Sequence, residues 1–204
     1  MTALDQLFEK VRAENRAALI AYIPAGFPSQ AGCHKVIAAF IAGGVDAIEI
    51  GYPYSDPVMD GPTIQAAAVT SLDNGTGAQE VLAALKVASA SVPAVVMTYW
   101  NPIERFGVSK FADAIAENGG SGVITPDLTI EESAGWIDAT EKSAINPIYV
   151  VAPSTKDARL SQVSAKCGGF VYAASLMGVT GARTSVSSGA ADLVARVRKV
   201  TDLP

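Results

Sequence analysis

The chain of 204 residues contains one histidine and only two cysteines, which excludes several kinds of site at the outset. Cys33 and Cys167 have no spacing typical of a metal-ligand set or a disulfide framework, and His34 has no second imidazole beside it. The sequence therefore predicts neither a metal site nor a histidine-based nucleophilic triad. We expect both thiols to lie in the core, as free cysteines commonly do.

Basic residues are also few, and they are scattered. The 15 Lys and Arg against 20 Asp and Glu give a net charge of −5, with no basic block that could follow the phosphates of a nucleic acid. No stretch stays apolar for the length of a membrane span, and the first 16 residues are charged and amphipathic rather than signal-like. We expect a cytoplasmic protein that binds neither nucleic acid nor membrane.

Half of the residues are hydrophobic, which is enough for one sizeable core, so we expect a single domain over residues 1–204. Apolar runs typical of strands alternate with amphipathic patterns typical of helices. The predicted strands are residues 18–23, 45–50, 94–99, 122–125, 147–151 and 170–174. The predicted helices are residues 3–14, 30–42, 63–71, 78–91, 110–117, 130–139, 156–165 and 189–200.

This alternation predicts a parallel sheet, because each helix must return the chain to the same edge. The loops that leave the strands are rich in Gly and Pro, which favours a TIM (β/α)8 barrel whose working face is made by those loops. We count six βα units and expect a seventh strand at VTDLP, so the barrel is incomplete as written. An open doubly wound sheet is the alternative, but the first turn, PAGFPSQ, lacks the glycine pattern of its nucleotide-binding form.

The candidate chemistry lies in IEIGYPYSDPVMDGPTIQ, residues 48–65. Strand alternation predicts that Glu49 points into the barrel while its two isoleucine neighbours face the helices. A carboxyl group buried there has a raised pKa suited to proton transfer, although a salt-bridged glutamate also fits the position. Asp60 follows in the loop, where an Asp-Gly pair also fits an ordinary turn. Two carboxylates in different surroundings can divide acid and base duties.

Other side chains are expected around the same mouth. Together they predict a pocket for a flat, mostly apolar ligand with a few polar anchors. Residues 175–189, which contain three glycines, are compatible either with a lid over the site or with a flexible loop that has no function. The strand ends are expected to present Tyr22, Tyr99, Asn101, Asp127, Val150 and Tyr172.

The signature SDP-x-x-DGP-x-IQ at residues 55–65, together with GVTGAR at residues 178–183, resembles the alpha subunit of tryptophan synthase. PAGFP, MTYWNPIERFG and PDLTIEES extend the resemblance along the whole chain. It implies a lyase of tryptophan biosynthesis that splits indole-3-glycerol phosphate into indole and glyceraldehyde 3-phosphate. It also implies that Glu49 shuttles a proton between the substrate's hydroxyl and the indole ring carbon, while Asp60 handles the proton of the indole nitrogen.

The resemblance further implies a substrate pocket and a surface for a partner. The partner is the tryptophan synthase beta subunit in an alpha2beta2 heterotetramer, and pyridoxal phosphate is that subunit's cofactor, with none in this chain. The implied substrate contacts are Tyr22, Tyr99, Ile124, Val150, Tyr172, Thr180 and Gly181. The implied partner surface comprises Pro53, Asp56 and Asn101.

The resemblance also implies a difference in length. Members of that family continue through two more strands whose loops supply most of the phosphate site, so we expect a C-terminally truncated member with little or no lyase activity. Tyr52 and Tyr54 stand where the family has smaller or plainer residues. Two other hypotheses are a barrel isomerase acting on a phosphorylated sugar with Glu49 as base, and a partner-binding protein without catalysis.

Overall fold

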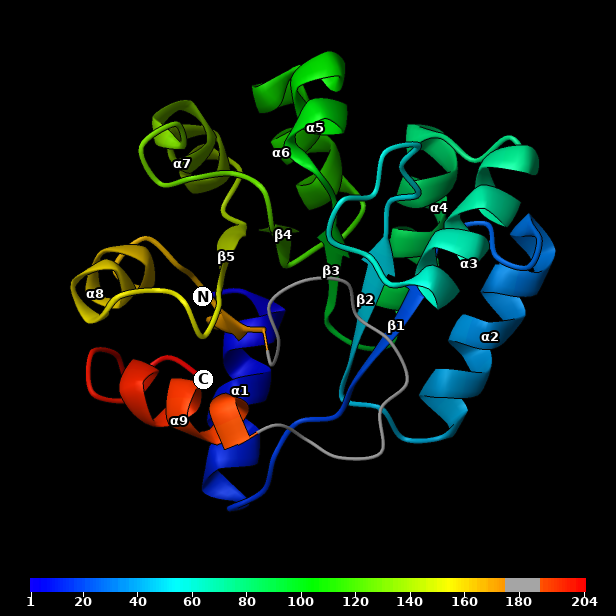
Figure 1. Ribbon diagram of the computed structural model, residues 1–204. Coiled ribbons are helices and arrows are strands. Elements are labelled where there is room, and N and C mark those ends of the chain that lie inside the picture. The colour runs from blue at the N-terminus through cyan, green and yellow to red at the C-terminus, as the bar shows by residue number, and fades with distance from the viewer. Residues whose placement is uncertain (175–187) are drawn as a thin grey trace.

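The computed structural model describes residues 1–174 and 188–204, which form a curled sheet of parallel strands with helices on its outer side (Figure 1). The six strands of the described residues lie in chain order, and every neighbouring pair is parallel. The first and last strands stand at the two ends of that order, so the sheet is a half-barrel of the TIM type, as the sequence predicts. The strands are β1 (Ile20–Pro24), β2 (Ala47–Gly51), β3 (Ala94–Met97), β4 (Gly122–Thr125), β5 (Asn146–Val151) and β6 (Tyr172–Ala173).

Helices connect successive strands and cover the outside of the curl (Figure 1). None of them, within the described ranges, is both long and apolar enough to cross a membrane. The helices are α1 (Ala3–Ala13), α2 (Gln30–Ala42), α3 (Pro62–Asp73), α4 (Ala78–Ser89), α5 (Trp100–Phe106), α6 (Val108–Glu117), α7 (Ala134–Lys142), α8 (Asp157–Ser164) and α9 (Ser188–Val197).

Several of the sequence predictions about elements are wrong in detail. Helix α5 was not predicted, and β3 ends at Met97 rather than at residue 99. Helix α7 begins at Ala134 rather than at residue 130, because the Ser133 hydroxyl donates to the Ile130 carbonyl oxygen and closes a turn ahead of the helix. Residues 201–204 form no strand, although the Val171 N–H donates to the Pro204 carbonyl oxygen at 2.9 Å, beside β6.

The two faces of β2 enter different parts of the core, because successive side chains of a strand alternate. Ile48 and Ile50 are fully buried against the helices of the outer layer. Ala47 lies in a second cluster inside the curl, and Glu49, two residues on, points the same way. The predicted inward orientation of Glu49 is confirmed. The inner cluster consists of Leu4, Ala47, Val95, Ile124, Ile148 and Phe170.

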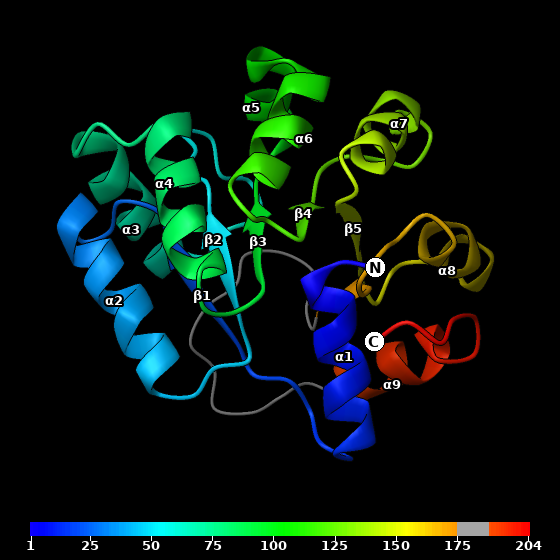
Figure 2. The same ribbon diagram turned by 180° about the vertical axis from the view of Figure 1, so that it is seen from behind.

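Helix α1 closes the end of the half-barrel at which the strands begin (Figure 2). Its Leu4 side chain is fully buried in the inner cluster. Thr2 and Asp5 form a capping box at its start, and the Asn146 side-chain amide donates to both, at 2.9 Å and 3.1 Å. Since Asn146 is the first residue of β5, these contacts fix α1 to the strand starts and leave the strand ends open.

Candidate active site at the carboxyl ends of the strands

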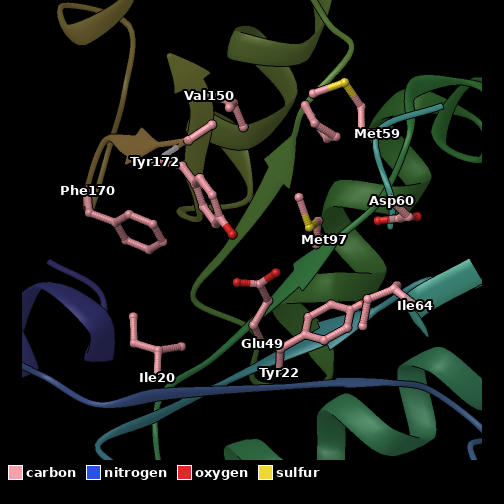
Figure 3. Close-up of a pocket in the computed structure, with 12 residues that line it drawn as sticks. Ile20, Tyr22, Glu49, Met59, Asp60, Ile64, Met97, Val150, Phe170 and Tyr172 are labelled. Atoms are coloured by element: carbon pink, nitrogen blue, oxygen red, sulfur yellow. The ribbon is translucent and has the colours of Figure 1, made fainter. Parts of the chain in front are cut away.

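A cavity of about 350 Å³ lies inside the curl of the sheet (Figure 3). Its walls are mostly apolar and aromatic, and two carboxylates enter it from β2 and from the loop that follows β2. A small number of polar groups in an apolar hollow is typical of a site for a small molecule. The lining residues are Ile20, Tyr22, Glu49, Met59, Asp60, Ile64, Met97, Pro126, Val150, Phe170, Tyr172 and Ala174.

Glu49 is the deeper of the two acids. Its side chain comes from the middle of β2, between Tyr22 of β1 and Val95 of β3, and the residue is only 7% exposed. Burial, together with the smaller effect of the nearby Asp60 charge, raises the pKa of Glu49 to about 7. A carboxyl group with a pKa near neutrality can both give and take a proton under physiological conditions.

Asp60 lies half-buried in the loop between β2 and α3. Burial raises its pKa, while the Tyr99 hydroxyl, which donates to Asp60 Oδ2 at 3.3 Å, lowers it. Its carboxylate therefore has a fixed partner that Glu49 does not share. The close-up shows the two acids on different walls of one cavity (Figure 3).

Two tyrosines stand beside Glu49. The Tyr172 hydroxyl points toward the Glu49 carboxylate (Figure 3). Burial raises the pKa of Tyr172 to about 12, with the charges of Glu49 and Asp60 adding to the effect. The pKa of Tyr22 is also raised well above its ordinary value, by burial first and then by the same two acids. Both phenols thus stay protonated and offer O–H groups to a ligand.

The structure brings most of the predicted site residues together. Tyr22, Glu49, Asp60, Val150 and Tyr172 line the cavity. The lining also contains residues that the sequence reasoning missed. Alternation along a strand could have found three of them, Ile20, Met97 and Phe170, because each lies two positions before a predicted tyrosine. The missed residues are Ile20, Met59, Ile64, Met97, Pro126, Phe170 and Ala174.

Two predicted substrate contacts lie behind the lining. Tyr99 is 5% exposed and meets the cavity through Asp60, to which its hydroxyl donates. Ile124 is fully buried in the inner cluster under the cavity. Thr180 and Gly181, together with the predicted lid, lie outside the described residues.

Asp127 is predicted to lie at the mouth of the cavity, but its carboxylate binds the start of a helix instead. Both of its oxygens accept from the Trp100 N–H, at 2.9 Å and 3.0 Å, at the first residue of α5. A carboxylate is stabilised at a helix N-terminus, where the N–H groups lack partners within the helix. Asp127 therefore fixes the start of α5 and does not line the cavity.

A second hollow of about 360 Å³ lies between the loop after β2 and helix α5, and we call it the Pro53 hollow. Two of the three residues predicted to face a partner, Pro53 and Asn101, line it. Asp56 is exposed and accepts a hydrogen bond from the Ser55 hydroxyl at 2.6 Å. The full lining is Tyr52, Pro53, Tyr54, Ser55, Leu72, Asn101, Pro102, Arg105 and Phe106.

Comparison with known proteins agrees with this arrangement. The family model described as tryptophan synthase alpha chain matches residues 8–204. A curated tryptophan synthase alpha chain from Thermobifida fusca is 53% identical over 202 residues, a match that covers 98% of this chain and 75% of the relative. The chain belongs to the tryptophan synthase alpha chain family. It is accordingly a lyase of tryptophan biosynthesis.

Solved structures of tryptophan synthase share the fold. That of Mycobacterium tuberculosis is 46% identical and superposes with a TM-score of 0.94, covering 100% of this chain and 78% of that one. A structure from Pyrococcus furiosus, described as a tryptophan synthase α2β2 complex, is 34% identical with a TM-score of 0.85, covering 91% and 75%. The half-barrel described above is therefore similar to a large part of each solved chain.

No group of three or more His, Cys, Asp or Glu side chains in residues 1–174 and 188–204 is arranged to hold a metal ion. Among the residues that the structure describes, two acids line the cavity, and they lie on different walls (Figure 3). Their arrangement suits proton transfer by the two carboxyl groups themselves.

Proposed function

We propose that the chain cleaves indole-3-glycerol phosphate into indole and glyceraldehyde 3-phosphate by a retro-aldol reaction. The observation that carries the proposal is the placement of Glu49 and Asp60 in one apolar cavity, the first deeply buried and the second held by Tyr99. Membership of the tryptophan synthase alpha chain family narrows the substrate to an indole compound. The aromatic walls of the cavity suit a flat ring of this kind.

The chemistry requires a proton to move between two atoms of the substrate. Protonation of the indole ring at C3 makes the ring an electron acceptor, and the electrons of the C3–C bond flow into it when that bond breaks. The neighbouring carbon then becomes the aldehyde as its hydroxyl loses a proton. Glu49, with a pKa near 7, takes the hydroxyl proton and supplies the C3 proton.

Asp60 acts on the other side of the ring. Positive charge develops at the indole nitrogen as C3 gains its proton. A carboxylate that accepts a hydrogen bond from that N–H stabilises the charge in a cavity of low dielectric constant. The wall position of Asp60, opposite the deeper Glu49, is compatible with a ring lying between them (Figure 3).

An indole-release assay with matched variants tests this function. Glu49→Gln and Asp60→Asn keep the size of each side chain and remove its charge, so we expect each to lower kcat by about 100-fold or more. Glu132→Gln, at an exposed position far along the chain, is the control and should keep the activity of the parent. Unchanged indole release by Glu49→Gln, with folding intact by circular dichroism, would refute the proposed role.

The activity of residues 1–204 by themselves is expected to be low. Strands β1 and β6 end the sheet without pairing to each other among the described residues, so the cavity has an open side. The assay should therefore include a second chain, extended at its C-terminus with the remaining residues of the Thermobifida fusca relative. If neither chain releases indole, or if either instead isomerises a phosphorylated sugar, the proposed function is wrong.

The partner that we propose is a tryptophan synthase beta subunit, bound at the Pro53 hollow in an alpha2beta2 assembly. The Pyrococcus furiosus structure is of such a complex, which supports the proposal by similarity. Pyridoxal phosphate would then belong to the partner, and a cytoplasmic location stays a prediction. Asn101→Arg, on the exposed side of the hollow, should weaken binding of a beta subunit by at least 10-fold in calorimetry, and Glu132→Arg should not.

A further inference from the structure

We propose that Tyr54 is a positioning residue for Asp60 and that it acts through the ring of Tyr99. Neither the cavity lining nor the predicted site residues include Tyr54. It lies in the loop that also carries Asp60, six residues earlier in the chain. Its assigned role rests on the proposed lyase function of Asp60.

The Tyr99 hydroxyl holds two consecutive residues of that loop. It accepts a hydrogen bond from the Met59 N–H at 2.9 Å and donates to Asp60 Oδ2 at 3.3 Å. A phenol has a single proton, and the Met59 N–H occupies one of the lone pairs of the oxygen, so the proton is directed at the carboxylate. One oxygen atom thus sets both the backbone before Asp60 and the orientation of its side chain.

The Tyr99 ring is held in turn by Tyr54. The ring centroids are 5.2 Å apart and the planes are tilted by 33°, within the range of favourable aromatic pairs. The backbone next to Tyr99 is fixed independently, because Asp127 accepts from the Trp100 N–H. The remaining freedom of Tyr99 is rotation of its side chain, and the Tyr54 ring restricts that rotation.

Rotation of the Tyr99 side chain moves its hydroxyl the most, because that is the atom farthest from the backbone. At 3.3 Å its bond to Asp60 is already longer than is usual for an O–H···O hydrogen bond, so a shift of a few tenths of an ångström breaks it. Asp60 then loses its orientation toward the cavity. Because the charge it stabilises develops only in the transition state, the loss appears in kcat more than in KM.

Three single variants and one double variant separate this role from general support of the fold. Tyr54→Leu removes the ring face but keeps apolar bulk, whereas Tyr54→Phe keeps the ring. Tyr99→Phe keeps the ring pair and removes the hydroxyl. We expect Tyr54→Leu and Tyr99→Phe each to lower kcat by about 10-fold with KM within about 2-fold, and Tyr54→Phe to keep the parental kcat.

The double variant Tyr54→Leu/Tyr99→Phe should lose no more activity than Tyr99→Phe alone, because both changes act on the same hydrogen bond. Additive losses would overturn the proposal, as would a Tyr54→Leu variant with parental kcat. A fall in kcat for Tyr54→Phe equal to that of Tyr54→Leu would also overturn it, since the ring would then not be the cause.

A second measurement does not depend on catalysis. In protein labelled with ¹³C at the aspartate carboxyl carbons, the Asp60 resonance is assigned by its absence in Asp60→Asn and is followed through a pH titration. The titratable groups facing Asp60 among the described residues are Glu49, Tyr22, Tyr99 and Tyr172.

Loss of the Tyr99 hydrogen bond should raise the midpoint of Asp60 in Tyr54→Leu and leave it unchanged in Tyr54→Phe. Asp138, which is exposed on α7, serves as the internal control. Identical Asp60 titrations in all three proteins would contradict the coupling. Absence of indole release with a shifted Asp60 midpoint would instead refute the lyase function alone.

Discussion

Tyr22 on β1 stands directly opposite Glu49 on β2 in the parallel register, so a phenol and a carboxyl group enter the cavity side by side. The space for the Tyr22 ring exists because Gly51, two residues after Glu49, has no side chain. A Cβ atom at Gly51 would overlap the Tyr22 hydroxyl oxygen and lie 2.7 Å from its Cζ. Gly51 is therefore part of the wall of the site.

Gly51→Ala should displace the Tyr22 ring and narrow the cavity. We expect the KM for indole-3-glycerol phosphate to rise by about 10-fold, with a loss of about 1–3 kcal/mol in the free energy of unfolding from overpacking. Gly135→Ala is the matched control, because nothing lies within 4 Å of its added Cβ on α7. That change should stabilise the protein by about 0.5–1 kcal/mol. Parental KM in Gly51→Ala would contradict the expectation.

Leu4→Ala should destabilise the protein by about 2–5 kcal/mol, because it leaves a cavity under the inner cluster that a rigid sheet cannot close. Leu19→Ala makes the same chemical change at a side chain that is 60% exposed, and it should stay within about 0.5 kcal/mol of the parent. Urea unfolding followed by circular dichroism measures both. Equal effects of the two variants would show that α1 does not seal the half-barrel.

Glu49 should make the stability of the folded chain depend on pH. Its pKa is about 7 in the folded protein and near 4.5 when unfolded, so the folded state holds the proton more tightly. Its contribution is fully present below about pH 4.5 and is lost as the pH rises through about 7, by on the order of 3 kcal/mol.

The measurement is urea unfolding of the parent and of Glu49→Gln between pH 4.5 and pH 8.5. The parent should lose stability relative to the variant as the pH rises, since glutamine does not titrate. The comparison within one pair removes the contributions of acids that do not interact with Glu49, whereas Asp60 is coupled to it. A constant difference across this range would mean that the pKa of Glu49 is not raised.

Much of the arrangement around Glu49 could be predicted from the sequence, because it depends on local rules. Alternation along β2 places Ile48 and Ile50 outward and Glu49 inward, and the structure has them so. The parallel strands follow from the repeated βα pattern, and their chain order follows from the barrel that the loops favour. The same rules could have placed Ile20 and Phe170 in the lining beside their predicted tyrosine neighbours.

Helix α5 depends instead on a contact between segments far apart in the sequence. It has seven residues, with Pro102 in its first turn, and so offers little periodicity of its own. Its first N–H group is satisfied by Asp127, which comes 27 residues later, at the end of a different strand. Strand β3 ends at Met97, two residues before the predicted end, and Tyr99 therefore lies behind Asp60 and not in the cavity wall.

The fixation of α1 has a consequence for synthesis of the chain. Thr2 emerges from the ribosome 144 residues before Asn146, which holds it. At about 5–20 residues per second, the nascent helix waits roughly 7 to 30 s for that partner. Through this interval Ile148 and Phe170 of the inner cluster are also missing, so Leu4 cannot complete its contacts and α1 is among the last of the described helices to dock.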